Sequence, residues 1–323
     1  MRMKPKILLS EDINPVGKKL LEDKFDILIA LDTSEATLLK IVKDVFGIIL
    51  RATTKVNRKV IQCARELKVI ARTGVGVDNI DIEAASTRGI YVCNTPGMND
   101  CTVAEHTVAL ILGLAKQILR MDKAVRTQRW SERFSEQQME VAGKTLGIIG
   151  LGAIGRLVAK KCGLGLDMKI LVYDPYFNGA VDANYITLID NLEELFVQSD
   201  FISIHAPNLP ETKGLVSLQY LSMMKNTAYL LNTARGDLVD EPALITVLKA
   251  KKIAGAALDV FQQEPLPADS PFNSLDNVIL APHVAGSTWE SNVRIAKAAA
   301  TAVLDVFEGR KPKFVYNYNQ LKI

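Results

Sequence analysis

The sequence predicts an α/β protein with two doubly wound parallel-sheet domains. Short apolar runs rich in β-branched residues alternate with amphipathic segments over most of the 323 residues, as is typical of buried parallel strands whose two faces are covered by helices. A long apolar helical segment interrupts the alternation once, which favours a domain boundary near residues 96–101. The chain length also suits about two domains.

The first block of elements has recognisable helix starts. Ser34 and Asp81 precede amphipathic runs, and their side chains are expected to accept the first free backbone N–H groups. We expect strands at Lys6–Ser10, Phe25–Ala30, Phe46–Arg51, Val69–Gly74 and Ile90–Thr95, and helices at Pro15–Lys24, Ser34–Asp44, Asn57–Lys68 and Ile82–Arg88.

Thr102–Arg129 is predicted to form one long helix. Its interior is apolar almost all round, which is typical of a helix buried between elements, between domains or in a dimer interface. His106 lies inside this segment, and a packed structural histidine is favoured over a catalytic one.

The second block repeats the alternation and ends in a long helix at Trp289–Glu308. The pattern itself does not show whether this helix returns to the first domain. Strands are expected at Thr145–Gly150, Lys169–Asp174, Phe201–Ala206, Ala228–Thr233, Ala254–Val260 and Val278–Pro282, with helices at Ala153–Gly163, Leu192–Ser199, Leu218–Lys225 and Pro242–Lys252.

Composition and charge exclude several classes of protein. The 39 basic and 36 acidic residues leave a net charge of +3, which is too balanced to suggest a nucleic-acid or polybasic membrane partner. No apolar run approaches the ~20 residues that span a bilayer, and the N-terminus lacks the apolar core of a secretion signal. The four cysteines have no CxxC spacing, so we expect reduced thiols in a cytoplasmic protein and no metal site.

A glycine-rich turn between an expected strand and an expected helix indicates a dinucleotide site. Gly150 permits the tight turn, Gly152 lets the backbone approach a pyrophosphate, and Gly155 allows close packing of the helix on the strand. The N-terminus of the helix would offer free N–H groups to the phosphates.

Asp174 ends the next expected strand and indicates which dinucleotide binds. A carboxylate there accepts hydrogen bonds from a ribose 2′-OH and repels a 2′-phosphate, which favours NAD over NADP. The alternative is a strand-terminating Asp-Pro turn; the glycine pattern at the right distance favours the cofactor.

Arg235, Glu264 and His283 each follow an expected strand of the second block. The carboxyl ends of parallel strands lie at one edge of a sheet, where ligands bind. An imidazole suits proton transfer near neutrality, a carboxylate orients the ring and stabilises its charged form, and a guanidinium binds a carboxylate bidentately. Each residue alone could be solvated or structural, but beside a cofactor site they predict oxidation of a 2-hydroxy acid.

Several motifs occur in a specific order: Arg72–Asp81, Asn94–Gly97, Gly150–Gly155, Asn232–Asp237, Ala257–Phe261, Glu264-Pro265 and Pro282-His283. This set resembles the NAD-dependent D-2-hydroxyacid dehydrogenase family over nearly the whole chain, and within it most resembles the phosphoglycerate dehydrogenases. The resemblance implies a flavodoxin-like substrate domain of residues 1–98 plus 290–323 and a Rossmann NAD-binding domain of residues 99–289. It also implies a cleft that closes on substrate and a homodimer or homotetramer built around Thr102–Arg129.

The resemblance implies roles for individual positions. His283 would be the acid/base, Glu264 its partner and Arg235 the carboxylate anchor, and the backbone N–H groups of Val75 and Gly76 would bind the same carboxylate. The residues implied along the cofactor are Gly150, Gly152, Ala153, Ile154, Asp174, His205, Ala206, Pro207, Thr233, Ala234, Asp259 and Gly286.

The resemblance leaves alternatives for the substrate. Arg51 matches a position that in phosphoglycerate dehydrogenases faces the substrate phosphate, which implies oxidation of 3-phosphoglycerate to 3-phosphohydroxypyruvate in serine biosynthesis; its alternative role is a local ion pair. The chain ends before the regulatory extension of longer phosphoglycerate dehydrogenases, so reduction of hydroxypyruvate or glyoxylate stays open. An NAD-sensing co-repressor is the alternative of another class, and Glu264, where a Gln would be expected, argues against a formate dehydrogenase.

Overall fold

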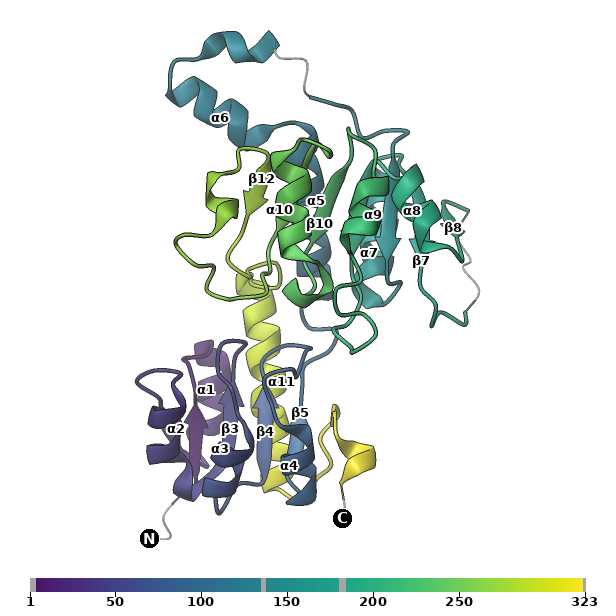
Figure 1. Ribbon diagram of the computed structural model, residues 1–323. Helices are drawn as coiled ribbons and strands as arrows, with labels where there is room; N and C mark the ends of the chain where they lie inside the picture. Colours follow the sequence, from purple (N-terminus) through teal and green to yellow (C-terminus); the bar gives the residue numbers. More distant parts are fainter. Residues whose placement is uncertain (1–3, 135–137, 180–183, 322–323) are drawn as a thin grey trace. The chain divides into compact units, whose positions relative to one another are not determined.

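The structure is a computed structural model that describes residues 4–134, 138–179 and 184–321. It divides into two compact units, Met1–Asn99 with Ser287–Ile323, and Asp100–Gly286. The first unit is therefore discontinuous in sequence, and the divisions lie one and three residues from those expected after residues 98 and 289. Each unit contains its own parallel sheet (Figure 1).

In the described residues, the first unit holds a five-stranded sheet in the order β2-β1-β3-β4-β5, all strands parallel. This is the flavodoxin-like order. The strands are β1 (Lys6–Leu9), β2 (Asp26–Ile29), β3 (Val45–Leu50), β4 (Val69–Arg72) and β5 (Tyr91–Cys93). The helices are α1 (Pro15–Leu21), α2 (Glu35–Ile41), α3 (Arg58–Cys63), α4 (Ile82–Thr87) and α11 (Trp289–Phe307), with the 3₁₀ turns η1 (Val42–Asp44) and η5 (Tyr318–Gln320).

Alternating strand residues divide the core of this unit between the two faces of the sheet. Ile7 and Leu9 of β1 pack with α1 and α11, whereas Leu8 packs with α2, α3 and α4 on the other face. This is the period-two pattern of a strand with both faces buried. The expected caps are confirmed, because Ser34 and Asp81 accept N–H groups of α2 and α4. The helix expected at Asn57–Lys68 is shorter, since the chain leaves helical geometry at Ala64.

The C-terminal segment returns to the first unit and covers the edge strand β5. A capping box between Thr288 and Ser291 begins α11. After the helix, Asn317 is 1% exposed: its amide oxygen accepts the Val92 N–H, and its nitrogen donates to Ser86 and Ile90. These bonds join the end of the chain to the edge of the sheet.

The second unit holds a seven-stranded sheet within the described residues, in the order β12-β11-β10-β9-β6-β7-β8, again all parallel. The order reverses between β6 and β9, which is the switch point where open α/β sheets bind ligands. The strands are β6 (Thr145–Ile149), β7 (Lys169–Tyr173), β8 (Ile186–Leu188), β9 (Phe201–Ile204), β10 (Tyr229–Asn232), β11 (Gly255–Leu258) and β12 (Val278–Leu280). The helices are α5 (Asp100–Ala115), α6 (Ile118–Arg126), α7 (Ala153–Gly165), α8 (Leu192–Gln198), α9 (Leu218–Met223) and α10 (Glu241–Lys249), with 3₁₀ turns η2 (Trp130–Phe134), η3 (Gly236–Leu238) and η4 (Pro271–Ser274).

Two apolar clusters cover the two faces of this sheet. Helices α5 and α7 pack on one face, and α8 and α10 pack on the other. Together the two sheets confirm the expected fold class. Strand β8 was not expected, because its three residues are only partly buried or exposed and form no apolar run.

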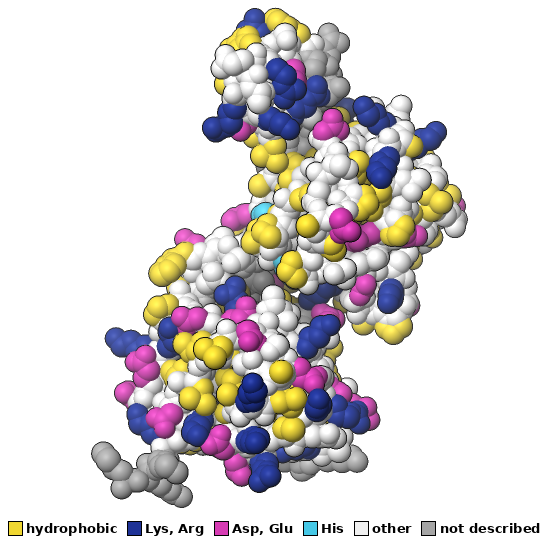
Figure 2. Space-filling view, turned by 60° about the vertical axis from the view of Figure 1, so that its left-hand side comes forward, with side chains coloured by type: hydrophobic (Ala, Val, Ile, Leu, Met, Phe, Trp, Pro, Cys, Tyr) yellow, Lys and Arg dark blue, Asp and Glu magenta, His cyan; other side chains and the backbone are white. Residues whose placement is uncertain are grey.

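The single helix expected over Thr102–Arg129 is wrong. Gln117 adopts a left-handed backbone conformation with φ 52°, and the chain bends by 57° between α5 and α6. Helix α5 stays packed in the core, whereas α6 and η2 project from the sheet of their unit (Figure 1). Figure 2 shows hydrophobic and basic side chains together on this projecting segment; its exposed apolar residues are Ile118, Leu119, Val125, Trp130 and Phe134.

Among the described residues, no single helix is long and apolar enough to cross a membrane. Only the bent pair α5 and α6 reaches that length and composition together, and α5 is largely buried against its own sheet.

Candidate active site

Three loops at one edge of the second sheet carry the expected chemistry. Arg235 follows β10, Glu264 follows β11 and His283 follows β12. Because these strands are parallel neighbours, their carboxyl ends lie side by side. The structure therefore brings these loops to one place although they are separated by up to 48 residues in sequence.

Glu264 and His283 form a direct pair. The Nδ1 atom of His283 lies 2.7 Å from Oε2 of Glu264, and Oε1 accepts the Phe261 N–H at 3.1 Å. Among the described residues nothing bonds Nε2 of His283. When Nδ1–H donates its hydrogen bond to Glu264, the neutral ring carries its lone pair on Nε2, where it can accept a proton.

The surroundings of Glu264 keep it ionised at neutral pH. Partial burial acts to raise the pKa of this carboxyl, but the hydrogen bonds from His283 and the Phe261 N–H, with the charges of His283 and Arg235, outweigh it. The net result is a pKa below the usual value. A permanently negative Glu264 can stabilise positive charge on the imidazole.

Close backbone approach joins the loops that carry Arg235 and Glu264. A Cβ at Gly236 would lie 2.0 Å from the carbonyl carbon of Phe261, so only glycine fits there. Asn232, 1% exposed, shapes the same turn: its side chain donates to the Arg235 carbonyl and accepts the Ala234 N–H. Arg235 donates to the Ala234 carbonyl at 2.6 Å.

Asp259 supports the loop of His283. It is fully buried, and its two carboxylate oxygens accept the N–H groups of Val284 and Ala285, each at 2.8 Å. Its carbonyl accepts the His283 N–H. These bonds hold His283 at φ 54°, in the left-handed region that few non-glycine residues adopt. Gly286 follows this loop as the last residue of the unit.

The glycine-rich turn between β6 and α7 has the features that a pyrophosphate requires. Gly150 has φ 94°, and a Cβ there would meet the His205 carbonyl at 2.9 Å, while a Cβ at Gly155 would meet the Gly150 oxygen at 2.2 Å. By contrast, no protein atom lies within 4 Å of a Cβ built on Gly152. The N–H groups of Gly152, Ala153 and Ile154 donate to no described residue. Open space and free donors at a helix N-terminus fit a phosphate group.

Asp174 lies at the end of β7, where it is bonded to the same turn. One carboxylate oxygen accepts the Leu151 N–H at 2.8 Å, and the other accepts the Tyr176 N–H at 3.0 Å. It therefore both terminates the strand, as the Asp-Pro alternative expected, and stands beside the dinucleotide turn.

The remaining cofactor candidates of this unit flank the switch point or follow β10. His205 follows β9, and its Nε2 bonds the Ser203 hydroxyl at 2.9 Å. Burial lowers the pKa of His205 to about 4, so its ring is neutral at pH 7 and does not suit proton transfer. Ala206 and Pro207 continue the same loop. Thr233 lies 3.1 Å from the Thr107 hydroxyl, which itself donates to Val103.

The candidate substrate residues belong to the first unit. Val75 and Gly76 follow β4, and their N–H groups donate to no described residue. Arg51 follows β3 and is exposed, with no ion-pair partner among the described residues. The Asn79 amide donates to the Arg51 carbonyl and so orders this strand end.

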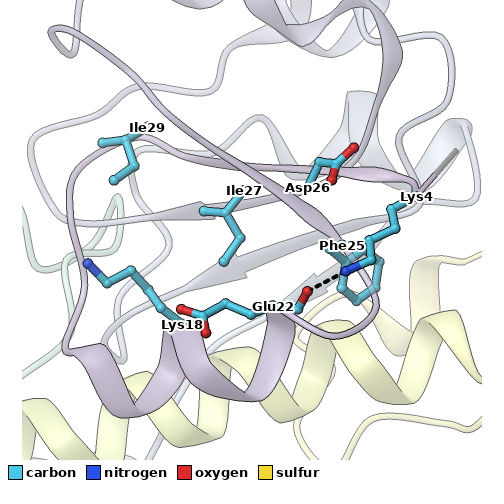
Figure 3. Close-up of a pocket in the computed structure, with 7 residues that line it drawn as sticks. All are labelled: Lys4, Lys18, Glu22, Phe25, Asp26, Ile27 and Ile29. Carbon is cyan, nitrogen blue, oxygen red and sulfur yellow. Dashed lines mark hydrogen bonds between the residues drawn. The ribbon is translucent and has the colours of Figure 1, made fainter.

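A separate depression of about 440 Å³ lies on the first unit between α1 and β2. Figure 3 shows its residues, which include Lys18 of α1, Glu22 directly after that helix and Ile27 of β2. It contains none of the candidate site residues. Among the described residues, no group of three or more His, Cys, Asp or Glu side chains could hold a metal ion.

Comparison with known proteins agrees with this geometry. The sequence model of the D-isomer specific 2-hydroxyacid dehydrogenase family, NAD binding domain, matches residues 108–285, which is more than half of the chain and lies within the second unit. The chain belongs to this family. The family model describes the NAD-binding domain of 2-hydroxyacid dehydrogenases, which act on a CH–OH group, so the expected family, reaction class and cofactor are confirmed at this level.

Other members of the family extend the likeness over the whole chain. A D-3-phosphoglycerate dehydrogenase of Synechocystis is 42% identical over 97% of this chain, which spans 56% of that relative's length. A glyoxylate reductase of Thermofilum pendens is 40% identical over 99% of this chain and 96% of its own. The solved structure of an NAD-dependent formate dehydrogenase from Staphylococcus aureus, in complex with NAD, has a TM-score of 0.86 at 30% identity, covering 97% of this chain and 98% of its own.

Sequence reasoning missed three contributors to this dehydrogenase site. Gly236 and Asn232 belong to a motif from which only Thr233, Ala234 and Arg235 were predicted as site residues. Asp259 was predicted along the cofactor, and the support that it gives to the His283 loop was not foreseen. A glycine directly after a candidate arginine was a signal for close backbone approach. Nothing in the sequence could indicate that Asp259 would meet residues 284 and 285, because that contact depends on the pairing of β11 with β12.

Proposed function

We propose that this protein is an NAD-dependent dehydrogenase that oxidises 3-phosphoglycerate to 3-phosphohydroxypyruvate and also catalyses the reverse reduction. The pair of Glu264 and His283 carries this proposal, because it stands at the same strand edge as Arg235, in a unit with a dinucleotide turn. Serine biosynthesis is the context that this substrate implies.

His283 would move the proton of the reaction. Bound NAD⁺ supplies the acceptor for the hydride that leaves the carbon atom of the alcohol. As that carbon becomes a ketone, its hydroxyl proton passes to Nε2 of His283, and the ring becomes an imidazolium that Glu264 stabilises. In the reverse direction the imidazolium returns the proton to the ketone oxygen.

Arg235 would bind the carboxylate of the substrate. Its guanidinium can form two parallel hydrogen bonds to a carboxylate and also polarise a neighbouring oxygen. The free N–H groups of Val75 and Gly76 are suited to the same carboxylate. A 2-hydroxy acid is the substrate class with a hydroxyl group next to a carboxylate.

Arg51 supports a phosphorylated substrate. It is an exposed cation at a strand end, without an ion-pair partner among the described residues. A dianionic phosphate would provide that partner. The competing function is reduction of hydroxypyruvate or glyoxylate, which has no phosphate, and a glyoxylate reductase is nearly as similar to this chain as a phosphoglycerate dehydrogenase.

The test is a comparison of kcat/KM for 3-phosphohydroxypyruvate, hydroxypyruvate and glyoxylate with NADH, in the wild type and in Arg51→Ala. We expect the substitution to raise KM for the phosphorylated substrate at least tenfold, which corresponds to about 1.4 kcal/mol, and to change KM for glyoxylate less than twofold. Equal effects on both substrates would exclude the phosphate role of Arg51. A wild-type preference for glyoxylate would favour the reductase.

We also propose a homodimer and a cytoplasmic location. The projecting α6 and η2 segment exposes several large apolar side chains, of which Trp130 is 62% and Phe134 70% exposed. Such a patch is typical of a protein interface, and a second copy of this chain is its proposed occupant. Among the described residues, Cys63, Cys93 and Cys162 form no disulfide, which suits a reducing compartment.

A further inference from the structure

We propose that His106 is a positioning residue, which acts through Asp259 on the backbone that carries His283. The proposal rests on the function proposed above, because it assigns His106 to the support of the same acid/base group. It extends the expectation that His106 is packed rather than catalytic: the residue touches the support of the catalytic loop, not a reacting atom.

Asp259 is the buried charge in this argument. It is 0% exposed, and its described polar contacts are the two backbone N–H groups of Val284 and Ala285. A buried charge away from water depends on the hydrogen bonds and opposite charges around it. If Asp259 moved away from Val284 and Ala285, the loop at His283 would lose two hydrogen bonds.

His106 is the basic group that faces this carboxylate. In the described part of the chain it is the one basic side chain within 4.0 Å of Asp259, with Nε2 lying 3.9 Å from Oδ1. The Nε2 atom is buried and has no hydrogen-bond partner among the residues that the structure describes. A distance of 3.9 Å permits electrostatic attraction but is too long for a hydrogen bond.

The missing hydrogen bond of the His106 Nε2 atom needs a physical explanation. A buried ring nitrogen without a hydrogen bond costs free energy, and such atoms in native proteins call for an explanation. The nearest candidate partner is the Asp259 carboxylate, and a shift of about 1 Å would close the gap to hydrogen-bond length. A proton on Nε2 would then stabilise the negative charge of Asp259 and hold the loop at residues 283–285.

The other polar groups around His106 are bonded elsewhere and do not pair with the Asp259 carboxylate. On α5 itself, Glu105 pairs with Lys161 of α7. Thr107 is bonded to Val103 and to Thr233 of the β10 loop. The β12 loop presents His283, which is bonded to Glu264. None of these groups compensates the charge of Asp259.

The first test measures coupling without turnover. The chain contains three histidines, so ¹⁵N NMR of the imidazoles gives three sets of signals that single substitutions assign. We expect Asp259→Asn to shift the His106 imidazole signals, because it replaces the carboxylate that faces Nε2 at 3.9 Å with a neutral amide. We also expect His106→Leu to shift the His283 signals and His106→Gln to restore them, since the Gln amide can place a donor near the position of Nε2.

Unchanged His106 imidazole signals in a folded Asp259→Asn protein would overturn the proposal. If Asp259→Asn does not fold, the His106 variants decide instead: His283 signals that are identical in His106→Leu and the wild type would overturn it equally.

The second test separates positioning from packing. We expect His106→Leu to lower kcat about tenfold or more while the dissociation constant of NADH stays within about twofold, and His106→Gln to recover most of kcat. Val108→Ala is the matched control: this residue packs in the same helix and core, so the variant should lower the melting temperature and leave kcat unchanged. Equal kcat losses in all three variants would mean a packing role only. If the wild type turns over no D-2-hydroxy acid, the proposed function fails, whereas the NMR test still decides the role of His106.

Discussion

At the scale of single residues, the chemistry depends on which group holds a charge at neutral pH. The hydrogen bonds of Glu264 and the neighbouring positive charge lower its pKa below the ordinary glutamate value near 4.3. Its carboxylate is therefore ionised at neutral pH. His205 has its pKa lowered to about 4 by burial and is neutral. At the same sheet edge, the surroundings thus make Glu264 a charged group and His205 a neutral one.

Glu264→Gln should impair the acid/base step in both directions of the reaction. The neutral amide cannot stabilise an imidazolium, so we expect kcat to fall on the order of tenfold to a hundredfold at pH 7. Reduction of a keto acid needs the protonated ring, so we expect the loss in the reduction direction as well. Rates of oxidation and of reduction at pH 7 check this.

The lowered pKa of Glu264 also predicts the sign of its effect on stability. A depressed pKa in the folded state stabilises the protein above the unfolded value, and this contribution is lost as pH falls through the folded value. We therefore expect the difference in melting temperature between wild type and Glu264→Gln to be larger at pH 6 than in acid and to shrink below about pH 4. A difference that grows in acid would contradict the assignment.

At the scale of elements, the site depends on how closely neighbouring loops approach. The turn after β10 lies against the backbone after β11 because Gly236 has no Cβ. In the same way, the turn after β6 lies against the segment after β9 through Gly150. The parallel strands bring the loops to one edge, and these glycines let them touch.

Gly236→Ala should separate the loops of Arg235 and Glu264. The added Cβ would lie 2.0 Å from the Phe261 carbonyl carbon, so the backbone must move, at a cost of about 1–3 kcal/mol. We expect a lower melting temperature and at least a tenfold loss of kcat. Gly165→Ala is the control, because nothing lies within 4 Å of a Cβ at this helical position, and it should keep full activity. A fully active Gly236→Ala would show that the close approach does not matter for catalysis.

At the scale of the whole molecule, the proposed dimer depends on α6 and η2, the projecting segment that follows the bend at Gln117. Its apolar side chains are exposed although they lie on an amphipathic helix, so their burial requires a partner. We expect light scattering at micromolar concentration to give twice the mass of one chain, and Leu119→Glu to give a single chain. Val197→Glu, at a similarly exposed apolar residue of α8, should leave the dimer intact. A monomeric wild type would contradict the proposed assembly.

The sequence by itself determined the alternation of strands and helices, the dinucleotide turn, the family and the three strand-end residues with chemistry. These signals are local: burial on both faces of a strand, a glycine spacing or a short motif can be read within a few residues. The break at Gln117 and the minor strand β8 escaped because an apolar run does not indicate where a helix bends, and a partly exposed strand has no apolar run.

Only the tertiary structure decided which groups meet. The contact of Asp259 with Val284 and Ala285, the pair of Glu264 and His283, and the position of His106 beside Asp259 join residues that are 19 to 153 positions apart. Such contacts follow from strand register and from the packing of α5 on the sheet. A one-dimensional pattern does not specify that geometry, because many registers bury the same apolar residues.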